Sequence, residues 1–120
     1  MKEKKLTSIG KGKVKSPYRS AYPDPLKLKP GEKVKLGKGI SEWSGWAWCE
    51  DKNGKTGWVP ESYLQIKGNS GKLLFDYDAT ELTVKKGEEL KILKEQSGWL
   101  WCENRKGDYG WVPKDKVCFR

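Results

Sequence analysis

The stretch "GWAWCEDKNGKTGWVP" at residues 45–60 returns as "GWLWCENRKGDYGWVP" at residues 98–113, and the two copies are identical at ten positions. Upstream, "LKLKPGEKVKL" (26–36) aligns with "LTVKKGEELKI" (82–92). Such a repeat in a chain of 120 residues predicts two units of about 55 residues rather than one larger domain. Units of this size bury a modest core, so large aromatic side chains must supply much of their stability.

The apolar residues of both copies recur with a period of two, which is typical of half-buried strands. In the first copy Leu26, Leu28, Val34 and Leu36 alternate with lysines, and "PG" reverses the chain between the two arms. Downstream, "WAWCE" and "TGWV" are predicted to form a hairpin around an Asn-Gly turn. Neither copy shows a convincing helical period. The sequence therefore predicts an all-β chain with two small, five-stranded barrels in tandem.

The same period predicts on which side of the sheet each Trp lies. Ala47, Cys49 and Val59 are the core-compatible residues of the first hairpin, so their neighbours point outward. Six of the seven Trp are expected on outer faces: Trp46, Trp48, Trp58, Trp99, Trp101 and Trp111. A clustered, exposed aromatic face on a small domain favours a binding surface.

The junction "KGNSGK" (67–72) is polar and Gly-rich and is interpreted as a short linker. The predicted organisation is a basic flexible arm over 1–12, a first domain over 13–66, this linker, and a second domain over 73–120. Of the net charge of +9, the first part of the chain carries nearly all: residues 1–67 have fifteen basic and seven acidic side chains, and residues 68–120 have ten and nine.

Residue types that carry most catalytic chemistry are scarce in this sequence. There is no His, and the three Cys lack a partner to activate them, so we expect no enzyme. Three scattered thiols do not complete a zinc site, so no metal or cofactor is expected. No run of 18 apolar residues and no apolar leader segment is present, which predicts a cytoplasmic chain with no membrane partner and reduced cysteines.

Each copy resembles a Src-homology-3 (SH3) domain of the kind found in small prokaryotic proteins. "LLFDYDA" (73–79) resembles the A-L-Y-D-Y strand of that family, and "ELTVKKGEEL" (81–90) resembles its diverging turn. "GWVPESYL" (57–64) is similar to the family's G-[YW]-[IV]-P-x-x-Y-[VL] segment. The resemblance covers nearly all of residues 13–119, twice. It implies SH3-like barrels that bind peptides, often Pro-rich segments in the polyproline II conformation.

The resemblance also implies which residues would line the peptide grooves. In the second copy Lys116 stands where the family has its last Tyr, and Phe75 replaces the first Tyr of A-L-Y-D-Y. We therefore expect a non-catalytic, monomeric module that recognises an extended peptide mainly through its first domain. The implied groove residues are Tyr18, Tyr22, Trp46, Trp58, Pro60 and Tyr63 in the first copy, and Tyr77, Trp99, Trp111 and Pro113 in the second.

Two other binding functions stay open at this point. Nucleic acid or another polyanion would bind the basic arm and the outward lysines of the first copy, with exposed rings stacking on unpaired bases. Those lysines are Lys27, Lys29, Lys33 and Lys35. Prokaryotic relatives that recognise cell-wall peptides or glycan provide a third reading.

Overall fold

The computed structural model describes residues 9–21, 24–37 and 45–119. These residues form twelve strands and two short 3-10 turns, and no α-helix occurs among them. The strands make two five-stranded sheets and one two-stranded ladder. The all-β prediction of two small five-stranded barrels is confirmed.

The chain divides into two compact units, with the divisions after Ala21 and after Thr80. We call Tyr22–Thr80 the continuous unit, and the two remaining segments together the split unit. These units differ from the expected domains, 13–66 and 73–120, because each unit takes its first barrel strand from the other sequence copy. We refer to this arrangement as the strand exchange.

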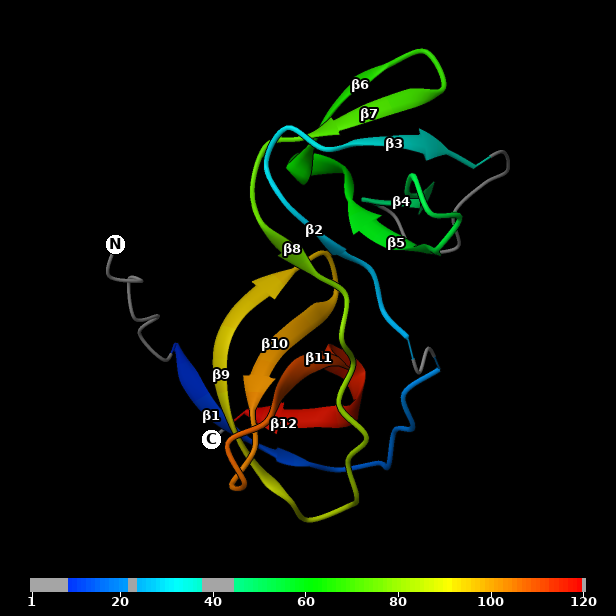
Figure 1. The fold of residues 1–120 in the computed structure, drawn as a ribbon. Coiled ribbons are helices and arrows are strands. Elements are labelled where there is room, and N and C mark those ends of the chain that lie inside the picture. The colour runs from blue at the N-terminus through cyan, green and yellow to red at the C-terminus, as the bar shows by residue number, and fades with distance from the viewer. Residues whose placement is uncertain (1–8, 22–23, 38–44, 120) are drawn as a thin grey trace. The chain divides into compact units, whose positions relative to one another are not determined.

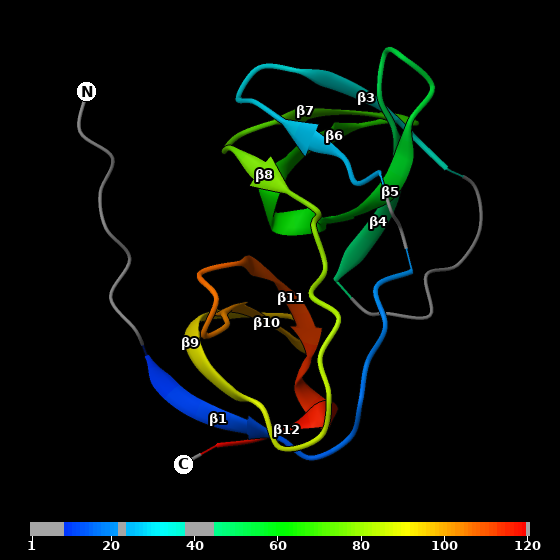
Figure 2. The ribbon, with the colours of Figure 1, turned by 60° about the horizontal axis from the view of Figure 1, so that its bottom comes forward.

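The split unit combines the start of the chain with most of the second copy. In order, its sheet consists of β11 (Tyr109–Pro113), β10 (Trp99–Glu103), β9 (Glu89–Gln96), β1 (Gly10–Val14) and β12 (Val117–Phe119). The turn η2 (Lys114–Lys116) precedes β12. In Figures 1 and 2 the blue β1 lies beside the red β12, and Lys13 is opposite Cys118 there and opposite Glu89 on β9. The core of this unit consists of Val14, Leu82, Val84, Leu90, Ile92, Leu100, Cys102, Val112 and Val117.

The continuous unit combines most of the first copy with the first strand of the second. In order, its sheet consists of β5 (Thr56–Pro60), β4 (Trp46–Glu50), β3 (Lys33–Leu36), β7 (Ser70–Leu73) and β6 (Leu64–Lys67). The turn η1 (Glu61–Tyr63) precedes β6, and β2 (Lys27–Leu28) pairs with β8 (Tyr77–Asp78). Its buried apolar residues include Leu26, Leu28, Val34, Trp46, Cys49, Val59, Pro60, Leu64, Leu73 and Tyr77.

A tight hairpin between β6 and β7 accounts for the strand exchange. Lys67 is opposite Ser70, which leaves only Gly68 and Asn69 to turn the chain. Gly68 has a φ of 62°, a conformation that glycine adopts without strain and that suits the first position of a type II′ turn. The expected linker at 67–72 is thus a hairpin. Because β7 returns directly along β6, it closes the barrel of the first copy, and β1 closes the barrel of the second.

The predicted alternation in 26–36 is confirmed, but the two arms do not pair with each other. Leu26, Leu28 and Val34 are buried, whereas the intervening lysines are exposed. Gly31, with a φ of 89°, lies in the turn between β2 and β3. β2 pairs with β8, and β3 pairs with β4 and β7, because the turn diverges and sends its arms to different neighbours.

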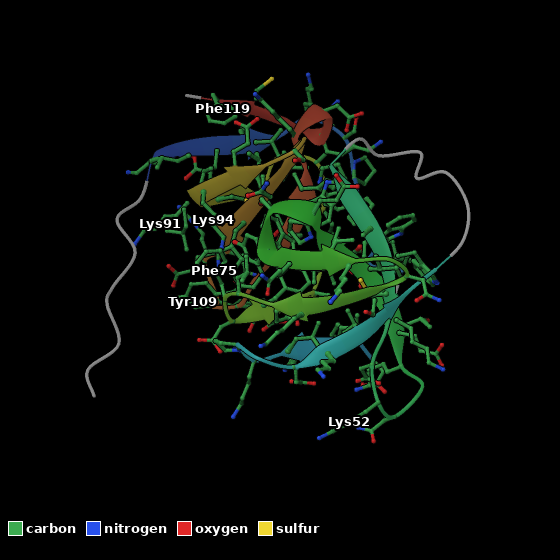
Figure 3. All side chains as sticks on the ribbon, turned by 90° about the horizontal axis from the view of Figure 1, so that it is seen from above. Lys52, Phe75, Lys91, Lys94, Tyr109 and Phe119 are labelled. Atoms are coloured by element: carbon green, nitrogen blue, oxygen red, sulfur yellow. The ribbon has the colours of Figure 1, made fainter. Side chains whose placement is uncertain are left out.

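The predicted β4–β5 hairpin is confirmed, and the second copy repeats its turn. The Asp51 carboxylate accepts hydrogen bonds from the backbone N–H groups of Asn53 (2.8 Å) and Lys55 (2.9 Å), and Gly54 has a φ of 83°. In the second copy the Asn104 side chain accepts from the equivalent backbone groups. Lys52 extends from the first of these turns (Figure 3).

Candidate functional site

Three aromatic side chains meet on the continuous unit, and we call them the Tyr63 cluster. The ring of Tyr63 lies 5.5 Å from that of Phe75 and 5.6 Å from that of Tyr77, measured between centroids. Both contacts are edge-to-face, with interplanar angles of 74° and 84°, the geometry that aromatic pairs prefer. Phe75, labelled in Figure 3, is 55% exposed, so about half of its surface is open to a ligand.

The backbone around the cluster fixes each ring from a different element. Pro60 ends β5 opposite Trp46 and begins the turn η1, which carries Tyr63. The N–H of Leu74 donates to the carbonyl of Tyr63 (2.8 Å), which holds the segment after β7 against η1. Tyr77 is 6% exposed, and its hydroxyl donates to the carbonyl of Trp58 (2.9 Å). The cluster is therefore anchored at its buried end and open at Phe75.

The strand exchange decides which copies supply these rings. Tyr63 comes from the first copy, whereas Phe75 and Tyr77 come from the second. Tyr18, which we expected beside Tyr63, belongs instead to the split unit. The groove predicted from the sequence did not include Phe75. Its place in "LLFDYDA", where the family has the first Tyr of A-L-Y-D-Y, was the feature that could have indicated it.

The split unit carries a smaller aromatic site around Tyr18. The Tyr18 ring contacts Trp99 edge-to-face at 5.8 Å, and its hydroxyl donates to Glu81 Oε1 at 2.7 Å. The same oxygen accepts from the backbone N–H of Ala21 (3.0 Å). Trp99 lies opposite Pro113, and Lys116 is half-buried. This site therefore has two half-buried rings, and the expected first groove is divided between the two units.

The prediction that six Trp are exposed is wrong for the described structure, although their side of the sheet was assigned correctly in the second hairpin. Trp46 is 4% and Trp111 is 3% exposed, and the other four are half-buried. Trp111 is absent from the core cluster of the split unit and lies 5.3 Å from Trp101. The Nζ of Lys94, which is labelled in Figure 3, lies over the Trp111 ring, 5.6 Å from its centroid. Strand parity gives the face of a side chain but not what covers it, and here neighbouring side chains cover these rings.

The remaining expected site residues are placed as follows. Trp58 is half-buried and packs edge-to-face on Trp48 at 5.0 Å, and Pro60 is buried. Lys27, Lys29, Lys33 and Lys35 are all exposed. Tyr22 lies outside the described residues.

The two equivalent cysteines are core residues. Burial raises the pKa of the Cys49 and Cys102 thiols to about 12, so both stay protonated and unreactive near neutral pH. Within the described ranges, no group of three or more His, Cys, Asp or Glu is placed to hold a metal ion. No helix in that part of the chain is long and apolar enough to cross a membrane.

Comparison with known proteins gives a family that agrees with the fold. The family model of the variant SH3 domain matches twice, at residues 11–67 and 71–118. No curated protein matches the chain. The two matches follow the sequence copies, whereas the compact units exchange their first strands. SH3 domains are in general non-catalytic modules that bind peptides or proteins. With both copies matched over most of their length, the chain belongs to the variant SH3 domain family.

Proposed function

We propose that the continuous unit binds an extended, Pro-rich peptide at the Tyr63 cluster, and that the protein acts as a non-catalytic adaptor in the cytoplasm. The observation that carries the proposal is the composition of this unit after the strand exchange. Its residues at the aromatic and Pro positions of the family pattern are Trp46, Pro60, Tyr63, Phe75 and Tyr77. All five positions carry an aromatic ring or the Pro; Phe75 is exposed and Tyr63 half-buried, while the other three are buried and support these two rings.

The chemistry of the Tyr63 cluster suits a polyproline II ligand. Such a peptide is already extended, so it loses little conformational entropy when it docks. Perpendicular rings at Tyr63 and Phe75 present flat faces and edges against which Pro side chains pack. Asp76, exposed beside Phe75, supplies a negative charge for a Lys or Arg next to the Pro segment. A single site of this kind gives a dissociation constant of about micromolar, or roughly 8 kcal/mol.

The split unit is the weaker candidate for the same ligand. Its site around Tyr18 has one aromatic contact, Tyr18 with Trp99, among the described residues, and Lys116 stands in the position that Tyr63 fills in the continuous unit. Glu81, the nearest acid, already accepts hydrogen bonds from Tyr18 and Ala21. We therefore assign the main binding site to the continuous unit.

Phe75→Ala tests the proposal in a chain with little change in stability, because the Phe75 ring is already 55% exposed. Tyr109→Ala is the matched control, since it removes a ring that is 47% exposed from the split unit. Peptide binding is measured by NMR titration with a panel of Pro-rich peptides. We expect Phe75→Ala to weaken binding at least about tenfold, as for an interface hot spot, and Tyr109→Ala to leave it unchanged.

Two results would argue against peptide binding at this site. One is that no Pro-rich peptide shifts resonances of the Tyr63 cluster in the parent protein. The other is that Phe75→Ala binds the same peptide as tightly as the parent, with both proteins shown to be folded by circular dichroism.

A further inference from the structure

One outer face of the continuous unit's sheet is covered with lysine. β3, β7 and β6 are neighbours in the sheet, and Lys33 is directly opposite Lys72, which is in turn opposite Gln65. Two residues further along, Lys35 is opposite Ser70, which is opposite Lys67. We call Lys33, Lys35, Lys67 and Lys72 the lysine face. The buried Val34 alternates with Lys33 and Lys35 and points to the core, and a Cβ at the opposite Gly71 would meet the Val34 and Leu64 side chains, so the four lysines share the outer side.

The charge of the lysine face is not neutralised by its neighbours. All four lysines are exposed, and none forms an ion pair with another residue in the described ranges. Glu50 is opposite Lys35 on β4, but the two form no salt bridge. Lys33 and Lys72 lie directly opposite each other. Like charges in this arrangement destabilise a sheet. The fold thus maintains a concentrated positive charge.

The equivalent face of the split unit carries a different arrangement of charge, in which Lys11 on β1 is directly opposite Lys91 on β9. Lys13 occupies on β1 the place that Lys72 occupies on β7, and its partner on β9 is Glu89 rather than a lysine. Glu89 also forms an ion pair with Arg105 at 3.5 Å. At the position of Lys33 the split unit therefore has an acidic residue, Glu89, where the continuous unit has a lysine.

We infer that the lysine face binds double-stranded nucleic acid through its phosphate backbone. Lysine is a compact point charge that suits phosphate, and it is depleted in protein–protein interfaces, where Arg and aromatic residues dominate. Gln65, which is opposite Lys72, is a hydrogen-bonding residue type that also contacts phosphates. No aromatic ring is present at these positions of the three strands. Stacking on unpaired bases, a main source of affinity for single strands, therefore has no platform here, which favours a duplex.

This surface differs from the one expected from the sequence. Lys67 and Lys72 join it because the strand exchange brings β7 between β3 and β6. Lys27 and Lys29 come from the segment of β2, which pairs with β8, and Lys27 is opposite Asp78 there. Because Lys27 has this acidic partner, it is a poorer phosphate site than the lysines of the lysine face.

Lys72→Gln and Lys13→Gln form a matched pair for the test, because each removes one positive charge from the same place in a different barrel. Binding of a fluorescein-labelled, mixed-sequence DNA duplex is measured by anisotropy over a series of salt concentrations. Each phosphate contact contributes about 0.9 to the slope of log affinity against log salt. We expect Lys72→Gln to lower that slope by about 0.9, Lys33→Gln to do the same, and Lys13→Gln to leave the slope of the parent unchanged.

The inference is overturned if the parent does not bind the duplex, or if the slope falls equally in Lys72→Gln and Lys13→Gln, which would indicate a general effect of net charge. A second arm uses vesicles that contain phosphatidylserine. Binding to these vesicles without binding to the duplex would assign the face to a membrane and would also contradict the inference. Each outcome is separate from peptide binding, which Phe75→Ala reports.

Discussion

Truncation of Val14 to Ala tests the strand exchange through the stability of one unit. Val14 is 2% exposed and lies in the core of the split unit, together with Leu90, Ile92 and Val117. The change removes two buried methyl groups, about 1.6 kcal/mol of transfer free energy at 0.8 kcal/mol each. The cavity left behind adds to this, so we expect the free energy of unfolding of the split unit to fall by roughly 2 to 3 kcal/mol.

Native-state hydrogen exchange, followed by NMR, reads this loss residue by residue. Since each 1.4 kcal/mol is a factor of ten, the opened split unit becomes roughly 30 to 150 times more populated. Amides of β9, β10 and β11 should lose protection by that factor, while those of β4 and β5 keep theirs. Leu73→Ala is the corresponding variant of the continuous unit, at a position 2% exposed on β7. It should lower the free energy of unfolding of that unit by roughly 2 to 5 kcal/mol, so that the amides of β4 and β5 lose protection instead.

Loss of protection in β4 and β5 of Val14→Ala, with β9 to β11 spared, would refute the strand exchange. That result would mean that β1 closes the barrel of its own sequence copy. An equal loss of protection in both units would likewise contradict the assignment of Val14 to one core.

Two further predictions concern packing and pH. Gly12→Ala should destabilise the split unit by roughly 1 to 3 kcal/mol in a thermal melt, because a Cβ there would lie 2.5 Å from a Val117 methyl group. Gly10→Ala, where a Cβ would meet only the Phe119 ring at 3.8 Å, should leave the melting temperature nearly unchanged; equal losses would contradict this. Burial raises the pKa of the Cys49 and Cys102 thiols to about 12, so the folded state holds protons that the unfolded state loses above about pH 9. Stability should therefore be full below pH 9 and fall above it by about 1.4 kcal/mol per pH unit for each thiol, and Cys49→Ala should remove one such contribution from urea denaturation curves.

Much of the fold could be predicted from the sequence, because a period of two reports the local backbone and the side on which each residue lies. The strands and the buried Cys49 and Cys102 follow from it. The first strands of the two copies could not be assigned in this way. "GKV" (12–14) and "GKL" (71–73) have the same pattern of small, charged and apolar residues, so each fits either barrel.

A single turn decides between the two assignments. Gly68-Asn69 lies between "LQIK" and "SGKL", and a Gly-Asn pair between two such runs is typical of a two-residue hairpin. The hairpin was not predicted, because "KGNSGK" was interpreted as a linker from its polarity and Gly content. The error carried over to the site, because the exchange makes Tyr18 part of the split unit and places Phe75 and Tyr77 with Tyr63 in the continuous unit.

The second feature that the sequence pattern could not predict is which neighbouring side chains shield an outward ring from solvent. Parity placed Trp111 on the side away from the core, and the structure agrees. It did not reveal that Trp101 and Lys94 would cover the ring. Exposure depends on contacts between strands and on side-chain lengths, neither of which a single strand's period contains.

Disulfide formation to the native Cys118 is the most direct measurement of the strand exchange. Cys118 is exposed and directly opposite Lys13 on β1, whereas Lys72, the equivalent residue of β7, is opposite Gln65 in the other unit. Residues directly opposite on antiparallel strands lie within disulfide reach, so Lys13→Cys should form an intramolecular disulfide with Cys118 under mild oxidation, and Lys72→Cys should not. Peptide mapping of the monomer identifies the bridge. A bridge between Cys118 and the introduced thiol of Lys72→Cys, with none in Lys13→Cys, would show that each copy closes its own barrel and would contradict the account.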